Sequence, residues 1–279
     1  MGGTSGNVAV ITGASSGIGK AAAEFLMNKG YKVYGTSRKK PADEDVVKAS
    51  SGEGFIRMLQ LDVCSGESVR DAVNRVLEAE GRIDVLINNA GMGIAGSVED
   101  TSPEEVFRQF DANFFGMHRM IREVLPAMRK QGKGLIVNIS SVAAVFPIPY
   151  QSMYVASKAA IEGMSGCLRN ELRPFGIKVA LVEPGDTKTG FTGSRVIAAG
   201  ADDNSAYRNY FGKSLDVMIR DETNGPDPVV VAREVYRVMK RRNPPVKVAV
   251  GFKYKVFLFI SRLVPSSFQS FIVSKMYEG

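Results

Sequence analysis

The sequence predicts an α/β protein: a doubly wound parallel sheet in a single domain, with a lid and a helical C-terminal extension. Short apolar runs rich in Val and Ile alternate along the chain with longer stretches of helical periodicity. The runs lack the polar alternation of a sheet with one wet face, so we expect helices to cover both faces. A glycine-rich turn directly after the first run indicates a ligand site at the sheet edge.

The expected elements follow in order along the chain. We predict strands at residues 8–11, 32–36, 55–61, 83–87, 134–139, 177–182 and 246–250. We predict helices at residues 17–28, 67–80, 103–130, 152–173 and 229–241, the third of them as two helices broken near Asn113 and strained at Pro126. Residues 186–227 lose periodicity, and so long an irregular stretch indicates a substrate lid or small local helices.

The composition excludes several classes of protein. The 279 residues include one His and two Cys, too few for a four-ligand zinc site made of these residues, so we expect no metal. We expect His118 to be structural or on the surface, and Cys64 and Cys167 to be small apolar fillers. The net charge of +7 comes from scattered residues without a nucleic-acid-binding motif, so we expect no nucleic-acid partner.

The ends of the chain bear on its location. Residues 1–7 show no signal-peptide pattern, and no apolar run is long enough to span a bilayer. We therefore expect a cytoplasmic protein. Residues 251–279 combine seven Phe and Tyr side chains with Lys and Arg. We favour packing of this extension beside the substrate entrance or a partner subunit, and contact with a membrane surface is the less favoured alternative.

The glycine-rich turn predicts phosphate binding. Gly13, Gly17 and Gly19 lie between the first strand and the first helix, where the backbone can turn tightly and approach a pyrophosphate. The end of the second strand normally selects the nucleotide, and no acidic residue occurs there before Asp43. Arg38 can instead pair with a 2′-phosphate, to which Ser15 and Ser37 can donate hydrogen bonds. These residues favour NADP(H) over NAD(H), and a solvated basic turn is the alternative.

Three residues form a candidate catalytic group. Tyr154 and Lys158 lie four positions apart on a predicted helix and therefore share a face. An ammonium beside a phenol lowers the pKa of the phenol, which would make Tyr154 a usable acid and base. Ser141 follows the fifth predicted strand at the edge where parallel sheets present ligand-binding residues, and Ser140 is its neighbouring competitor.

These motifs together resemble the short-chain dehydrogenase/reductase family, whose fold is of the Rossmann type. The matching residues occur in family order from about residue 7 to 250 and include Thr12, Gly13, Gly17, Gly19, Asp62, Val63, Asn88, Asn89, Ala90, Gly91, Asn113, Ser141, Tyr154, Lys158, Pro184, Gly185 and Thr189. The resemblance implies that residues 1–250 form a dinucleotide-binding catalytic domain. It also implies a homodimer or homotetramer.

The resemblance further implies a role for each matching position. Tyr154 would be the acid and base, Lys158 would hold the nicotinamide ribose, Ser141 would orient the substrate oxygen, and Asn113 would support a water in the proton relay. The residues implied to line the cofactor are Gly13, Ser15, Ser16, Gly17, Ile18, Gly19, Ser37, Arg38, Asp62, Val63, Asn89, Ala90, Gly91, Tyr154, Lys158, Pro184, Gly185, Thr187 and Thr189. Family spacing to Tyr154 selects Ser141 over Ser140.

The expected substrate is a bulky apolar alcohol or ketone. The candidate lining is mostly uncharged and comprises Met92, Ile94, Ser141, Ala143, Phe146 and Tyr150, although several of these can equally be core residues. The sequence looks most like the hydroxysteroid and retinol dehydrogenase branches, which favours a hydroxysteroid or ketosteroid. Alternatives are a retinoid, a 3-ketoacyl compound or a long-chain ketone. A non-catalytic NADP-binding interaction protein is a further alternative, disfavoured because Tyr154 and Lys158 are both present.

Overall fold

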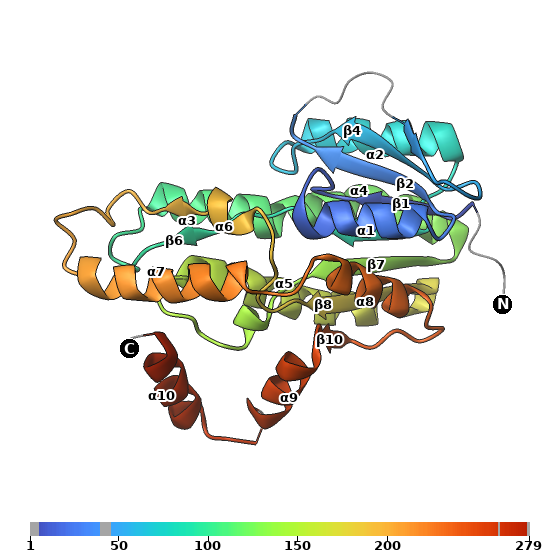
Figure 1. Cartoon of the computed structure of the whole chain (residues 1–279). Coiled ribbons are helices and arrows are strands. Elements are labelled where there is room, and N and C mark those ends of the chain that lie inside the picture. The colour runs from blue at the N-terminus through green and yellow to red at the C-terminus, as the bar shows by residue number, and fades with distance from the viewer. Residues whose placement is uncertain (1–5, 40–45, 262, 278–279) are drawn as a thin grey trace.

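The computed structural model describes residues 6–39, 46–261 and 263–277, and within them the chain forms a sheet covered by helices (Figure 1). The sheet has eight strands in the order β10-β8-β7-β5-β1-β2-β4-β3 in this part of the chain. Its neighbouring strands run parallel, apart from β3 against β4. The order reverses between β1 and β5, as in a doubly wound fold, which confirms the predicted fold class.

The predicted strands form, with ends displaced by one or two residues. The strands of the main sheet are β1 (Val8–Ile11), β2 (Lys32–Ser37), β3 (Val46–Lys48), β4 (Phe55–Gln60), β5 (Val85–Asn88), β7 (Gly134–Ile139), β8 (Ile177–Glu183) and β10 (Lys247–Ala249). A separate small sheet pairs β6 (Ile94–Ala95) with β9 (Val196–Ile197). We did not predict β3, β6 or β9, because runs of two or three residues are too short to show a period.

The helices also follow the prediction. They are α1 (Gly17–Met27), α2 (Gly66–Glu80), α3 (Pro103–Phe110), α4 (Gly116–Gln131), α5 (Ser152–Glu171), α6 (Phe191–Ser194), α7 (Arg208–Thr223), α8 (Val229–Met239), α9 (Phe252–Ser261) and α10 (Ser266–Tyr277), with short turns η2 (Val142–Ala144) and η3 (Arg173–Phe175). Ser102 caps α3 by accepting a hydrogen bond from the Glu105 amide at 3.2 Å. The expected break near Asn113 is a π-helical turn, η1 (Asp111–Phe115), which joins α3 to α4 without a gap.

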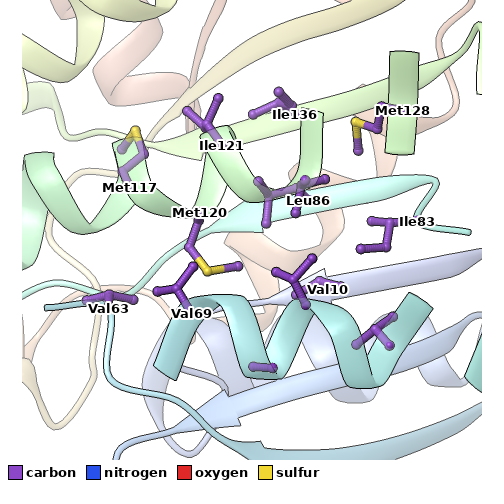
Figure 2. Packing of buried hydrophobic residues seen from close by; sticks show 14 of the residues in the cluster. Val10, Val63, Val69, Ile83, Leu86, Met117, Met120, Ile121, Met128 and Ile136 are labelled. Atoms are coloured by element: carbon purple, nitrogen blue, oxygen red, sulfur yellow. The ribbon is translucent and has the colours of Figure 1, made fainter. Parts of the chain in front are cut away.

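Two hydrophobic layers hold the sheet between its helices. On one face, side chains of α2, α4 and α5 pack against the sheet, and Figure 2 shows Val69, Leu86 and Met120 in this cluster. On the other face α1 and α8 pack together, with Leu26 and Val235 completely buried. Because both faces are covered, the ends of the strands are the places where the sheet can present ligand-binding groups.

The lid and the C-terminal extension are both helical. Residues 186–227 contain α6 and α7, so the lid has ordered structure despite its weak periodicity. The extension folds into α9 and α10, which project from the body while the end of α10 returns towards α7 (Figure 1). Within the described residues, none of the helices is long and apolar enough to cross a membrane.

The histidine and the two cysteines all lie at the surface. His118 lies exposed on α4, in agreement with the expectation of a surface residue. Cys64 and Cys167 are also exposed, so the prediction that they fill the core is wrong. Each lies where a short loop or an outward helix face carries it into solvent, which its residue type alone could not reveal.

Candidate active site

The three candidate catalytic side chains meet at the carboxyl end of β7. Tyr154 and Lys158 lie one turn apart on α5, and Ser141 lies two residues after β7. The Tyr154 hydroxyl is hydrogen-bonded to Ser141. The Lys158 ammonium lies 5.7 Å from the centroid of the Tyr154 ring and donates a hydrogen bond to the Ile139 carbonyl at 2.9 Å. The fold therefore brings together a phenol, an ammonium and a hydroxyl from two different elements.

The structure also separates Ser141 from its neighbour Ser140. The Ser140 hydroxyl donates to the Glu162 carboxylate at 2.9 Å, and the residue is buried. Ser141 begins the short turn η2, where its hydroxyl accepts a hydrogen bond from the Ala143 amide at 3.1 Å. Since successive residues in extended backbone point in opposite directions, only Ser141 faces Tyr154.

Burial dominates the protonation of this site. It raises the pKa of Tyr154 to about 12. The hydrogen bond with Ser141 and the charge of Arg195 lower this pKa, and the charge of Glu222 raises it. Burial also lowers the pKa of Lys158 to about 8. The expected net lowering of the Tyr154 pKa by Lys158 is therefore wrong for this structure, because loss of water outweighs the other influences. At neutral pH Tyr154 carries its proton.

Asn113 positions the loop that follows β5. Its amide donates to the Met92 carbonyl at 3.0 Å and to the Ser157 hydroxyl at 3.1 Å, and its oxygen accepts from the Met92 amide at 2.8 Å. Ser157 in turn donates to the Tyr154 carbonyl at 2.7 Å. One turn earlier, buried Gln109 donates to the Met92 carbonyl and accepts from the Ile94 amide, both at 2.7 Å. Sequence reasoning missed Ser157 and Gln109, whose only signal is their helical spacing from Tyr154 and Asn113.

The glycine-rich turn is locked to this same loop. Gly13 and Gly17 have φ values of +68° and +53°, which favour glycine. The Thr12 hydroxyl accepts from the backbone amides of Asn89 and Ala90 at 2.9 and 3.0 Å. The Asn89 side chain donates to the carbonyls of Thr12 and Gly13 at 3.0 and 3.1 Å. We had matched Thr12 to the family motif, but had not expected it to hold the turn against Asn89.

The open end of α1 fits a pyrophosphate. In the described part of the chain, the Ser16 side chain makes no capping hydrogen bond, and the first turn of α1 carries no acidic residue. Unpaired amide groups and the positive end of the helix dipole therefore face the turn, where Ser15 and Ser16 are exposed and Ile18 is half-buried. A Cβ added at Gly17 would lie 3.3 Å from Thr189 Cβ, so the loop after β8 borders the same turn.

The residues expected to bind the adenosine half of the cofactor follow strands β2 and β4. Arg38 is exposed directly after β2, and Ser37 accepts a hydrogen bond from the Lys39 amide at 3.3 Å. After β4, the Asp62 carboxylate accepts from the Cys64 amide at 2.9 Å, while Val63 is buried in the core. Asp43, the first acidic residue after β2, lies outside the described residues.

The candidate substrate-lining residues differ in how deeply they are buried. Ile94, Ala143 and Phe146 are buried, Ile94 in β6 and Phe146 against Phe257 of α9 with ring centroids 4.3 Å apart. Met92 and Tyr150 are half-buried. Tyr150 has a φ of +61°, and its ring packs on Phe211 of α7 at 5.5 Å. Ile94, Ala143 and Phe146 are therefore core residues, the alternative that the sequence left open for several members of this set.

The lid adds an aromatic residue that the sequence did not reveal. The ring centroid of Phe191, on α6, lies 5.7 Å from that of Tyr154. Its position depends on the return of the lid to the start of α5, which has no local sequence signal.

The C-terminal extension reaches the loop after β8. Adding a Cβ at Gly185 would place it 2.1 Å from Tyr254 Cζ, so the tyrosine ring lies directly against this glycine. The Asp186 amide donates to the Tyr254 hydroxyl at 3.0 Å, and that hydroxyl donates to the Asp186 carboxylate. Thr187 donates to the Gly185 carbonyl at 2.9 Å. The extension therefore supports the loop that carries Pro184, Gly185, Thr187 and Thr189.

The sequence and the fold both match known proteins. A family model described as short chain dehydrogenase matches residues 7–198. The chain is 46% identical over 244 residues to 3-ketodihydrosphingosine reductase of Bacteroides thetaiotaomicron, covering 88% of this chain and 87% of the relative. It is 34% identical over 259 residues to human retinol dehydrogenase 8, covering 88% and 81%. The crystal structure of a short-chain dehydrogenase from Streptomyces avermitilis superposes with a TM-score of 0.79 at 36% identity, covering 91% of both chains.

Proposed function

The chain belongs to the short-chain dehydrogenase family, and from this premise we propose that it is an NADP(H)-dependent reductase of long-chain lipid ketones. The observation that carries the reaction is the meeting of Ser141, Tyr154 and Lys158 at the end of β7. The oxidoreductase class follows from the family. The coenzyme preference and the substrate are the parts that we propose.

The chain's own residues supply a proton and an orientation. The bound nicotinamide would supply the hydride. Tyr154 holds its proton at neutral pH, because burial raises its pKa to about 12, and it can donate that proton to the oxygen of a ketone under reduction. Ser141 lies within hydrogen-bonding distance of the Tyr154 hydroxyl and so can orient the same oxygen. Lys158, fixed by the Ile139 carbonyl, is placed to hold the ribose.

The preference for NADP(H) rests on Arg38 and Ser37. Arg38 is exposed at the end of β2, and the following sequence has no acid before Asp43 that would accept from a ribose hydroxyl. We expect Arg38→Asp to lower the ratio of kcat/KM for NADPH to kcat/KM for NADH by at least about tenfold. Arg57→Asp is a control on the neighbouring strand. A wild-type enzyme that turns over NADH as well as NADPH would contradict this preference.

The substrate class rests on the relatives and on the lining of the lid. The relative from Bacteroides thetaiotaomicron is named for a ketone of the sphingoid type, and the human relative for retinol. The Phe191 ring offers apolar surface beside Tyr154, and Met92 and Tyr150 are half-buried. Oxidation of NADPH with long-chain ketones, steroid ketones and retinal, compared in parallel, tests the proposal. Turnover confined to small polar ketones would refute it, and turnover confined to steroid ketones would support the ketosteroid alternative.

The sequence favours packing of the extension over membrane contact, and α9 does pack on Gly185 and Phe146; from the exposed aromatic rings we also propose that the outer face of the extension meets an anionic membrane surface. Phe259 and Phe271 are 63% and 58% exposed, on α9 and α10. Residues 252–277 contain four cationic residues and no acidic one, which suits anionic lipid. We expect sedimentation with phosphatidylglycerol vesicles but not with phosphatidylcholine vesicles, and loss of binding in the double variant Phe259→Ser/Phe271→Ser. Phe107→Ser, at an exposed ring on α3, is the matched control. Equal sedimentation of the double variant would refute the proposal.

A further inference from the structure

A buried ion pair joins the two helices of the lid and lies outside the group of Ser141, Tyr154 and Lys158. The Arg195 side chain, at the end of α6, is only 3% exposed. Its Nη2 donates to the Glu222 carboxylate on α7. The second oxygen of that carboxylate accepts from the Thr192 hydroxyl at 2.6 Å. Both carboxylate oxygens are thus engaged, and Glu222 holds the guanidinium in one place.

The guanidinium keeps one nitrogen unused. Nη1 of Arg195 is buried and has no hydrogen-bond partner among the residues that the structure describes. A buried donor without an acceptor is unfavourable, and such groups are rare in folded proteins. Because Glu222 already neutralises the charge of Arg195, the group that is missing is a hydrogen-bond acceptor and not a second anion. A neutral oxygen satisfies this requirement best.

The Arg195 guanidinium lies close to the reacting centre. The Arg195 guanidinium carbon is 5.9 Å from the centroid of the Phe191 ring, and that ring is 5.7 Å from the Tyr154 ring. One aromatic side chain therefore separates the ion pair from the proton donor. The charges of Arg195 and Glu222 also act on Tyr154, in opposite directions. A substrate whose ketone lies against Tyr154 could place an oxygen a few bonds away beside Arg195.

Resting on the proposed reductase function, we propose that Arg195 is a specificity-determining residue that recognises a hydroxyl group near the ketone of the substrate. Nη1 donates to the hydroxyl oxygen, and Glu222 with Thr192 fixes the guanidinium for this contact. The lid thereby selects ketones that combine a long apolar chain with a hydroxylated head over ketones that are apolar throughout. A site built to bond a hydroxyl discriminates strongly against the analogue that lacks it.

The experiment compares two ketones of equal chain length, octadecan-3-one and 1-hydroxyoctadecan-3-one, with NADPH in detergent micelles. We expect the wild-type enzyme to show kcat/KM at least about tenfold higher for the hydroxyketone. Arg195→Lys keeps a positive charge for Glu222 but lacks the forked pair of nitrogens, and we expect the preference to fall below about threefold. Arg220→Lys, at an exposed pair with Asp221 on the same helix as Glu222, is the control and should retain the preference.

The outcomes separate this proposal from the function on which it rests. If neither ketone is reduced, the proposed function fails and this inference fails with it. If the wild-type enzyme reduces both equally well, the reductase function stands and the role of Arg195 is overturned, whether or not Arg195→Lys folds. A purely structural role would lower kcat/KM for both ketones in proportion, so an unchanged preference in folded Arg195→Lys would also overturn it.

Discussion

The contact between Gly185 and Tyr254 makes the substitution Gly185→Ala a sharp test of how the extension is attached. The new Cβ would lie 2.1, 2.2 and 2.5 Å from three carbons of the Tyr254 ring. Carbon atoms approach favourably at about 3.5–4.0 Å, so the ring must move by about 1.5 Å. This shift breaks the two hydrogen bonds between the Tyr254 hydroxyl and Asp186, one of them to a carboxylate. From typical values for such bonds, we expect a loss of about 2–4 kcal/mol in the free energy of unfolding.

The measurement is a double-mutant cycle followed by urea unfolding and circular dichroism. In the Tyr254→Ala background the obstructing ring is gone, so Gly185→Ala should cost less than about 1 kcal/mol there. Gly190→Ala is the matched control in the same loop, because its Cβ would meet no atom within 4 Å among the described residues. An equal cost of Gly185→Ala in both backgrounds would show that the tyrosine ring is not the obstacle, and would refute the reasoning.

Three further predictions concern the site itself. Tyr154→Phe removes the proton donor and should lower kcat for ketone reduction by about 10²–10⁴-fold with an unchanged circular dichroism spectrum; near-normal turnover would contradict the assignment. Burial lowers the pKa of Lys158 to about 8 from 10.5, so the unfolded chain binds the additional proton between these values. The free energy of unfolding should therefore rise by up to about 3 kcal/mol from pH 8 to 10.5, and Lys158→Met should remove this contribution in pH-dependent urea unfolding. Thr12→Val keeps the side-chain shape but leaves the amides of Asn89 and Ala90 without their acceptor. It should lower the free energy of unfolding by about 2–4 kcal/mol in urea, and a change below about 0.5 kcal/mol would contradict this role.

Local patterns predicted most of the fold. The six strands from β1 to β8 that show an apolar run were found within two residues of their expected ends, and helix α3 begins at Pro103, as expected. The break expected near Asn113 is a π-helical turn. The sequence could not show this, because a local widening of the helix leaves the spacing of its apolar residues almost unchanged. The exposure of the two cysteines and the direction in which the pKa of Tyr154 shifts were mispredicted. Both depend on how far the surrounding chain excludes water from the side chain.

The sequence by itself determined the order of strands and helices, the glycine-rich turn and the pairing of Tyr154 with Lys158 on one helix. These features depend on residues within a few positions of each other, where backbone geometry leaves few choices. Only the tertiary structure decided that Phe191 lies beside Tyr154, that Arg195 is buried on Glu222, and that Tyr254 lies on Gly185. Those contacts join segments of the chain that meet only once the sheet, the lid and the extension have packed, and local periodicity carries no information about such meetings.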